Sequence, residues 1–334
     1  MKKIAEEIKE VVSINPITLA ELINKAEGIE SISTDYSVSK VDCNNLLFNE
    51  DATLSFIDDN DNLVKNIGMS RHAFSQLCAK VGVPVRYLEK CIKSGRLDLA
   101  QSNINGWLYD LKKDLFIREY NGTIRGILSS RYSVCDSPDI LKVISSIPNI
   151  NDYSIKGSYL NEERLHLRLI NNNKLPIDDD LFAGLFVDSS DVGRSTLTVK
   201  FGIYKQVCTN GLVVCQKGGM LFEQKHIGIT ADEFYERLVK SLSNFDELEE
   251  KAYNYVFKAT KDKLKVYNTE DYLKTIGNIT HLDENSVQKV YDLQKDKYDF
   301  SKWGLINGIT EVAQDYTLEK RLELEKLAGN LLVA

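Results

Sequence analysis

Apolar residues recur with two different periods along this chain, and the period changes twice. Over residues 1–113 they recur every three or four positions, as in "PITLAELINKA" and "SRHAFSQLCAKVGVPVRYLEKCI", which predicts helices. Within that part, "ATLSFIDDNDNLVKNIG" predicts two short strands around a polar turn. Over 114–229 strict alternation dominates, and from 230–334 the helical period returns. The pattern predicts an α+β protein in which a central antiparallel sheet with packed helices lies between a helical N-terminal part and a helical C-terminal part.

A break within the first part predicts two short helices in succession. Ser70 is placed to cap the first helix, and Gly82 with Pro84 separates it from the second. This order is similar to a helix-turn-helix, with basic residues on the second helix at Arg86, Lys90 and Lys93. Two short packed helices are also common in α-rich domains, and no base-reading set is evident. The pattern alone therefore does not assign duplex recognition.

Two hairpins are predicted at Asn-Gly steps, which favour two-residue turns. In "LFIREYNGTIRGIL" such a turn at 121–122 puts Arg118 directly opposite Arg125. Like charges at a cross-strand pair are destabilising unless an anion or a carboxylate lies between them. A further hairpin with an Asn-Glu-Glu turn is expected in "YSIKGSYLNEERLHLRLI".

The stretch "YKQVCTNGLVVCQ" contains the second Asn-Gly step, at 210–211. A two-residue turn there places Cys208 and Cys215 on one face but diagonally, with Cα atoms roughly 7–8 Å apart, which is too far for an unstrained disulfide. The same register puts Tyr204 opposite Lys217. These thiols are therefore expected to be buried packing residues, like the chain's other cysteines, Cys43, Cys78, Cys91 and Cys135.

Strand alternation predicts a basic face on the central sheet. In "RLHLRL" the leucines share the core side, and Arg164, His166 and Arg168 share the other. In "STLTVKFGIYKQV" the polar side carries Lys200 and Tyr204. Either a nucleic-acid backbone binds this face, or Asp and Glu from the acidic helices cover it as a layer of ion pairs. The candidate phosphate contacts are Arg118, Arg125, Arg164, Arg168, Lys200 and Lys205, although parity puts Lys205 on the apolar side, and the candidate base-stacking residues are Tyr120 and Tyr204.

Charge and composition narrow the class of protein. The 334 residues carry a net charge of −7, with 14 basic against 16 acidic residues over 1–113, 13 against 13 over 114–226, and 15 against 20 over 227–334. The N-terminus lacks the apolar run of a signal peptide, and no segment resembles a membrane span, so a cytoplasmic protein without membrane contact is expected. Phosphate-binding, dinucleotide, hydrolase and zinc motifs are absent, which predicts no cofactor, no metal site and no catalytic residue.

Several segments together resemble one family. They are "MSRHAFSQLCAKVGVPVRYLEKC", "ILSSRYSVCDSPDIL", "GRSTLTVKFGIYKQVCTNGLVV", "KHIG" and "WGLINGITEVAQD" followed by "LEKLAG", spread over roughly residues 68–330. The chain is similar to the phage- and plasmid-borne family labelled domain of unknown function 932. That resemblance implies a mobile-element protein of the bacterial cytoplasm, encoded among replication and recombination genes, and it brings no catalytic residue with it. The order of strands and helices also resembles that of single-strand annealing recombinases, which hold DNA in a basic groove.

Three functions from different classes are therefore considered, of which the third, an enzyme acting on nucleotides, is favoured only by the genes among which the family is found. The leading hypothesis is a phage or plasmid protein that binds single-stranded DNA as a homo-oligomer, including strand annealing in recombination. The alternative is a phage effector that binds and inhibits a host defence or repair protein through its acidic helices. The acidity of the chain departs from the annealing proteins and counts against tight DNA binding.

Overall fold

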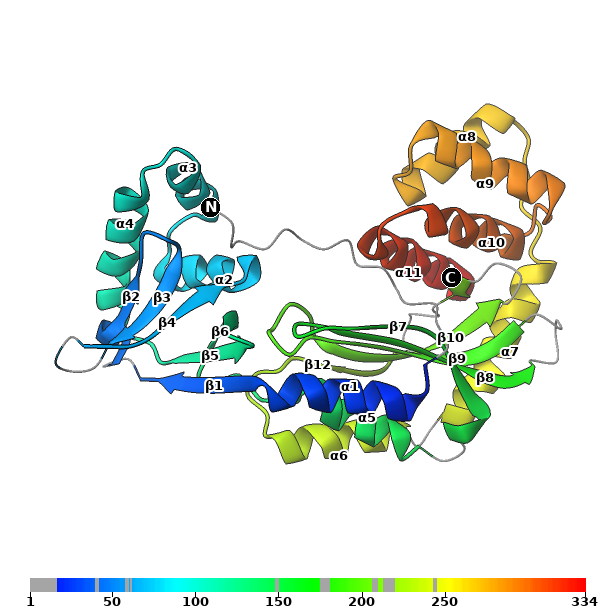
Figure 1. Ribbon diagram of the computed structural model, residues 1–334. Coiled ribbons are helices and arrows are strands. Elements are labelled where there is room, and N and C mark those ends of the chain that lie inside the picture. Colours follow the sequence, from blue (N-terminus) through cyan, green and yellow to red (C-terminus); the bar gives the residue numbers. More distant parts are fainter. Residues whose placement is uncertain are drawn as a thin grey trace.

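Two six-stranded sheets organise the chain, one in each half of Figure 1. The computed structural model describes residues 17–39, 42–57, 60, 62–147, 150–174, 181–205, 210–212, 220–242 and 245–334, with some side chains in these ranges also left undescribed. All structural statements below concern these residues.

The first sheet is mostly antiparallel, with strand order β1-β5-β6-β4-β3-β2 and a short parallel pairing between β4 and β6. Its strands are β1 (Ser33–Val38), β2 (Leu46–Phe48), β3 (Thr53–Ile57), β4 (Leu63–Met69), β5 (Leu115–Tyr120) and β6 (Thr123–Ser129). The helices of this part are α2 (Arg71–Val81), α3 (Val85–Lys93) and α4 (Leu97–Tyr109), with a 3-10 turn η1 (Asp42–Asn45). The sheet joins strands from both sides of residue 113, where the sequence predicted a boundary.

The two short helices predicted after residue 69 are present as α2 and α3. The Ser70 hydroxyl accepts a hydrogen bond from the Ala73 amide at 3.1 Å and so caps α2. The helix ends at Gly82, whose φ of 73° is in the left-handed region that glycine adopts without a steric penalty. The buried side of α2, which includes Phe74 and Leu77, packs in one core with the apolar residues of the sheet.

The second sheet has the order β11-β10-β9-β8-β7, and β12 pairs with the other end of β10. Its strands are β7 (Tyr153–Leu160), β8 (Leu165–Lys174), β9 (Leu181–Ser189), β10 (Leu197–Lys205), β11 (Asn210–Leu212) and β12 (Met220–Gln224). The helices of this part are α1 (Leu19–Ser31), α5 (Ser137–Ser145), α6 (Ala231–Leu242), α7 (Phe245–Lys261), α8 (Thr269–Thr280), α9 (Glu284–Asp296), α10 (Lys302–Val312) and α11 (Leu318–Val333), with 3-10 turns η2 (Ile150–Asp152) and η4 (Ala313–Asp315).

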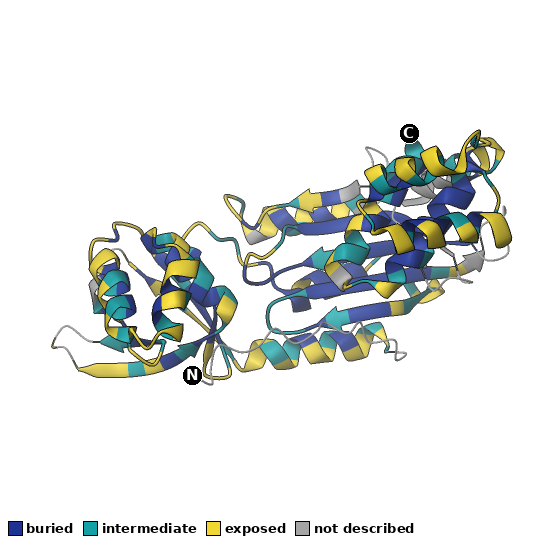
Figure 2. Ribbon diagram, turned by 90° about the horizontal axis from the view of Figure 1, so that it is seen from above, coloured by how far each residue is buried: buried dark blue, intermediate teal, exposed yellow. Residues whose placement is uncertain are grey.

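Helices cover both faces of the second sheet. In Figure 1, α1, α5 and α6 lie on one side of it and α8 to α11 lie on the other. The alternation of "RLHLRL" is as predicted, because Leu165, Leu167 and Leu169 all lie in the apolar core. Figure 2 shows the same division, with buried positions running along the strands and exposed positions on the outer sides of the helices.

The predicted α+β class is confirmed, as are the helices after residue 230. The hairpin at 121–122 is also confirmed, since Tyr120 pairs with Thr123 and the two turn residues have φ values of 45° and 77°. Two details of strand register are wrong, however. A bulge in β6 places Gly126, not Arg125, opposite Arg118.

The second wrong register concerns the Asn-Gly step at 210–211. Asn210 and Gly211 lie inside β11, where they pair with Lys205 and Tyr204, so they do not form a two-residue turn and the β11 partner of Tyr204 is Gly211, not Lys217. The pairing of β11 with β10 therefore overrides the local turn preference of the Asn-Gly step. Cys208 and Cys215 lie outside the described residues, whereas the other four cysteines are buried and belong to no disulfide.

A search of the described helices for a membrane span found none of sufficient length and hydrophobicity.

Candidate functional site

Arg118, a predicted phosphate contact, is buried and held by the protein's own acidic groups. Its side chain is only 2% exposed, and all five of its N–H groups donate hydrogen bonds. Two go to the Asp35 carboxylate at 3.0 and 3.1 Å, two to the Asp136 carboxylate at 2.5 and 2.6 Å, and one to the Asp191 carbonyl at 2.8 Å. Burial opposes the charge, but the hydrogen bonds to Asp136 and Asp35 outweigh it and raise the pKa of Arg118.

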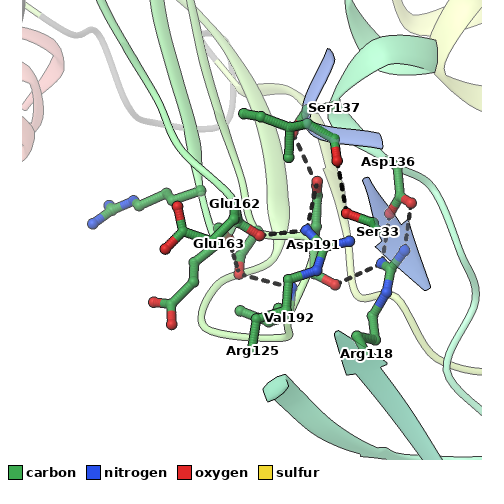
Figure 3. A network of polar contacts seen from close by, with 12 residues as sticks. Ser33, Arg118, Arg125, Asp136, Ser137, Glu162, Glu163, Asp191 and Val192 are labelled. Carbon is green, nitrogen blue, oxygen red and sulfur yellow. Dashed lines mark hydrogen bonds and ion pairs between the residues drawn. The ribbon is translucent and has the colours of Figure 1, made fainter. Parts of the chain in front are cut away.

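Arg125 lies beside this group and is also buried, at 3% exposure of the side chain. Its Nη1 donates to the Glu162 carbonyl and lies 3.8 Å from the Asp191 carboxylate (Figure 3). Burial and then the neighbouring charge of Arg118 lower the pKa of Arg125. The anion that the sequence required between two arginines is therefore provided from within the chain.

This buried network connects the two sheets. Asp35 comes from β1, Arg118 from β5 and Arg125 from β6 of the first sheet, whereas Asp136 stands at the start of α5 and Asp191 follows β9. A buried ion-pair group of this kind fixes the relative position of the elements it joins, because each charge is costly without its partner. A role of these two arginines in nucleic-acid binding stays a prediction that their burial does not favour.

Asp191 makes the network sensitive to pH. Its carboxylate accepts a hydrogen bond from the Ser137 hydroxyl at 2.9 Å, but burial and then the charge of Asp136 raise its pKa to about 7. Because the folded pKa is raised, its favourable contribution to stability is complete below the ordinary carboxyl pKa of about 4 and is lost as pH rises toward 7.

Replacing Asp191 by asparagine is expected to remove this titration. The stability of the wild type relative to Asp191→Asn should fall as pH rises from about 4 to about 7 and then become constant. Urea unfolding of both proteins at several pH values measures the difference. A difference that stays flat or grows with pH over that range would contradict the assignment.

The predicted basic face of the second sheet is covered by α11. Arg168, 4% exposed, donates from Nη2 to both oxygens of Glu325 at 3.0 and 2.7 Å, and Glu325 is fully buried. Arg164 lies 3.6 Å from Asp188 in the neighbouring strand. The ion pair expected from the acidic helices is therefore present for Arg168, whereas the partner of Arg164 comes from the sheet itself.

His166 belongs to the same layer and has no nitrogen free for catalysis. Its Nδ1 lies 3.0 Å from the Asp188 carboxylate, and its Nε2 accepts a hydrogen bond from Arg168 at 3.2 Å. Although burial acts against the charge, His166 and then Arg164 hold the pKa of Asp188 below its usual range. A general base needs a nitrogen that can reach substrate, so this His-Asp pair is a structural element.

The other residues predicted to contact nucleic acid lie in different parts of the two sheets. Lys200 is half-buried and lines a cavity of about 420 Å³ between the polar face of the sheet and α11, and the lining also includes Glu223 and Glu323. Tyr120 is half-buried at the end of the first hairpin. The backbones of Tyr204 and Lys205 lie in β10, but their side chains are outside the described part.

Positive charge gathers instead on the helices of the first part. Residues 70–113, which form α2, α3 and α4, contain eight Lys and Arg residues against three Asp and Glu, a net charge of +5 in a chain of −7. We call this segment the basic layer. Such a concentration of one sign produces a local field that attracts anions even when the whole protein is acidic.

Helix α3 presents the centre of the basic layer. Leu88 and Cys91 face the core, whereas Arg86, Lys90 and Lys93 are exposed at spacings of four and three, which places them on one face. None of these three has an ion-pair partner within the described part of the chain. Glu89 on the same helix pairs with Arg71 of α2 at 3.4 Å, so the nearest acidic side chain is already engaged.

Two exposed aromatic side chains lie on α3 and on the neighbouring helix α4. Tyr87 of α3 is 41% exposed and Trp107 of α4 is 57% exposed. Asn103 of α4 donates a hydrogen bond to the Tyr87 hydroxyl at 3.5 Å and precedes Trp107 by one helical turn. Exposed aromatic rings beside cations are the combination that stacks on unpaired bases and contacts the backbone of a single strand.

No group of His, Cys, Asp and Glu within the described ranges has the geometry of a metal site. Asp35 and Asp136 are engaged with Arg118, and Glu325 is engaged with Arg168.

These features define an α+β protein with two sheets joined by buried ion pairs, in which a helical layer on the first sheet carries the positive charge. The chain belongs to the family described as Domain of unknown function (DUF932), whose model matches residues 125–323. No curated protein and no solved structure matches the chain. The family match begins at β6, so β1 to β5 and the basic layer lie outside the matched range.

The excess of Lys and Arg in the basic layer can be found in the sequence, but only when residues 70–113 are counted by themselves. Counted over 1–113, the excess of basic residues in 70–113 is cancelled by acidic residues in 1–69. Exposure of Trp107 could not be read from the sequence, because apolar spacing on α4 does not distinguish it from the buried Ile104 and Leu108.

Proposed function

We propose that this protein binds nucleic acid through the basic layer, with a preference for single strands. The observation that carries the proposal is the unpaired, exposed face of α3, formed by Arg86, Lys90 and Lys93, within a segment of net charge +5. Cations on one helix face contact phosphates without reading sequence. The contacts proposed from the sequence thus move from the sheet to the helices of the first part.

Single-strand preference rests on Tyr87 and Trp107. Stacking of a base on an aromatic side chain is available only when the base is unpaired, and it contributes about 1–3 kcal/mol per base. Strand annealing in recombination, a phage or plasmid origin and assembly into a homo-oligomer are further parts of this proposal. They come from the resemblance described above and need their own tests.

Fluorescence anisotropy of labelled oligonucleotides tests the proposal directly. Affinity for a single strand should exceed that for a duplex of the same length and should fall steeply with salt, because binding releases counterions. Trp107→Ala should weaken single-strand binding roughly fivefold or more and duplex binding much less. Tyr267, 88% exposed between α7 and α8, gives a control variant Tyr267→Ala that should leave both affinities unchanged.

Absence of binding to any oligonucleotide at low salt would refute the proposal. The protein-binding effector would then be the next hypothesis to test, with the acidic helices of the C-terminal part as its expected contact surface. Equal affinities for single strand and duplex, unaffected by Trp107→Ala, would refute the single-strand preference alone.

A further inference from the structure

A second positively charged site lies where the two sheets meet. A cavity of about 430 Å³ opens between α2 and β6 of the first part and the loop after β9 together with the segment after β12 of the second. Its polar lining includes Lys80, Arg194, Ser195, Lys225 and His226. A volume of this size is in the range of small-molecule sites. We call it the junction cavity.

The loop after β9 is held in place from both sides of the cavity. The Val192 carbonyl accepts a hydrogen bond from Gln76 of α2 at 2.9 Å and lies 3.1 Å from His72 Nε2. The Ser190 hydroxyl donates to the Glu163 carbonyl at 2.8 Å and accepts from the Arg194 amide at 3.0 Å. The wall of the junction cavity is therefore preformed, which lowers the cost of ordering it on binding.

The charges of the junction cavity are unbalanced. Lys80, Arg194 and Lys225 line it, and no Asp or Glu belongs to the lining that the structure describes. Arg194 pairs with Glu163 at 2.9 Å, outside the lining, whereas neither lysine has an ion-pair partner within the described ranges. By comparison, the cavity around Lys200 contains carboxylates of Asp188, Glu223 and Glu323 as well as cations.

Lys80 is held at an electrostatic cost. Burial lowers its pKa, and the nearby charges of Lys113 and Arg131 lower it further. An anion bound in the cavity beside Lys80 would offset both the burial of this ammonium group and its repulsion by Lys113 and Arg131. A doubly charged oxyanion matches this excess better than a neutral or cationic ligand.

Two further donors point to a ligand. His226 is 3% exposed, and neither of its ring nitrogens has a hydrogen bond of normal geometry. Burial lowers the pKa of His226, and the nearby backbone of Ser133 partly opposes this effect. The Ser195 hydroxyl is buried without a partner as well. Buried polar groups are rarely left unpaired, so such atoms beside a cavity indicate an absent ligand group or water. Tyr132 stacks on the His226 ring at 5.3 Å and fixes its plane.

We propose that the junction cavity binds a phosphomonoester, with Lys80, Lys225 and Arg194 around the phosphate and with His226 and Ser195 as further donors. The volume leaves room for the group attached to the phosphate. This chemistry is shared by a free nucleoside monophosphate and by the terminal phosphate of a strand. The site is distinct from the exposed face of α3, and the inference stands without the function proposed for that face.

Isothermal titration calorimetry distinguishes the two sources. The full chain is titrated with deoxyadenosine 5′-monophosphate, with deoxyadenosine, with inorganic phosphate and with one oligonucleotide carrying either a 5′-phosphate or a 5′-hydroxyl. We expect the monophosphate to bind and deoxyadenosine not to bind if the source is a free nucleotide. We expect the 5′-phosphate to strengthen oligonucleotide binding if the source is a strand end.

Variants assign the binding to the junction cavity. Lys80→Gln and Lys225→Gln should each weaken binding of the phosphorylated ligand roughly tenfold or more, since each removes one charge-assisted contact. Lys265→Gln, an exposed lysine between α7 and α8, is the matched control and should have no effect. Circular dichroism confirms that each variant is folded.

The inference is overturned if no phosphorylated ligand binds at millimolar concentration, if deoxyadenosine binds as well as its monophosphate, or if the two lysine variants bind like the control. Because the mononucleotide is too short to span the face of α3, its binding should survive charge reversal on that helix. The experiments therefore distinguish a failure of nucleic-acid binding at α3 from a failure of phosphomonoester binding in the junction cavity.

Discussion

Replacing Arg118 by methionine should lower the free energy of unfolding by about 3–5 kcal/mol, because it leaves the buried carboxylate of Asp136 without its partner and also removes the ion pair with the partly exposed Asp35. Asp136 is 9% exposed as a side chain and has both oxygens bound to Arg118, while Asp35 is 32% exposed. Asp136 also stands at the N-cap of α5 but makes no capping bond there, so its carboxylate has no second partner on that helix. Chemical denaturation followed by circular dichroism measures the loss.

In the Arg118→Met variant, the two sheets should also unfold less cooperatively with each other. The five hydrogen bonds of Arg118 reach β1, the start of α5 and the loop after β9, so their loss weakens the connection between the parts. We expect a broadened or two-step unfolding transition and faster proteolysis near residues 130–136.

Arg86→Met is the matched control for this loss, because it removes an exposed arginine and should change stability by no more than about 0.5 kcal/mol. Equal stability of the two variants would contradict the network. A further variant that replaces Asp136 by leucine together with Arg118→Met should recover part of the loss, since it removes a stranded charge.

Reversing the charges of α3 should abolish nucleic-acid binding while leaving the fold intact. The triple variant Arg86→Glu/Lys90→Glu/Lys93→Glu changes the net charge of the basic layer from +5 to −1. If all three contact phosphates, the slope of log affinity against log salt for a single strand should fall by about 2, and affinity at low salt should fall by roughly 100-fold or more. Anisotropy titrations at several salt concentrations measure both quantities.

The control for this experiment changes the overall charge equally at another place. Lys258→Glu/Lys265→Glu/Lys295→Glu alters three exposed lysines of the acidic C-terminal part. If nucleic-acid binding depended on net charge alone, the two triple variants would lose affinity together. Retained affinity in the α3 variant would exclude the proposed surface, whereas loss in the α3 variant only would support it.

Arg118 and Arg125 are unsuitable positions for a test of nucleic-acid binding. Both side chains are at most 3% exposed, so charge reversal there would destabilise the fold, and a loss of binding would not identify a contact. From the sequence alone, an arginine pair at a hairpin is equally compatible with a bound phosphate and with carboxylates of the same chain. The positions of Asp35, Asp136 and Asp191, which are far apart in sequence, decide between them.

The sequence by itself determined the α+β class, the hairpin at 121–122, the apolar face of "RLHLRL" and the succession of α2 and α3. These depend on short-range periodicity, turn preference and capping, which act within one element. It did not determine the bulge that shifts Arg125 or the register of 210–211, because pairing with neighbouring strands overrides a local turn signal.

Only the tertiary structure decided which charges are used internally and which remain outside. Arg168 and Glu325 are 157 positions apart and meet because α11 packs over the polar face of the second sheet. The exposed face of α3 and the junction cavity depend equally on which helices and loops come together. Burial of a charge is a property of everything packed around it, and for that reason a pattern along the chain could locate basic residues but not tell which of them are free to bind a partner.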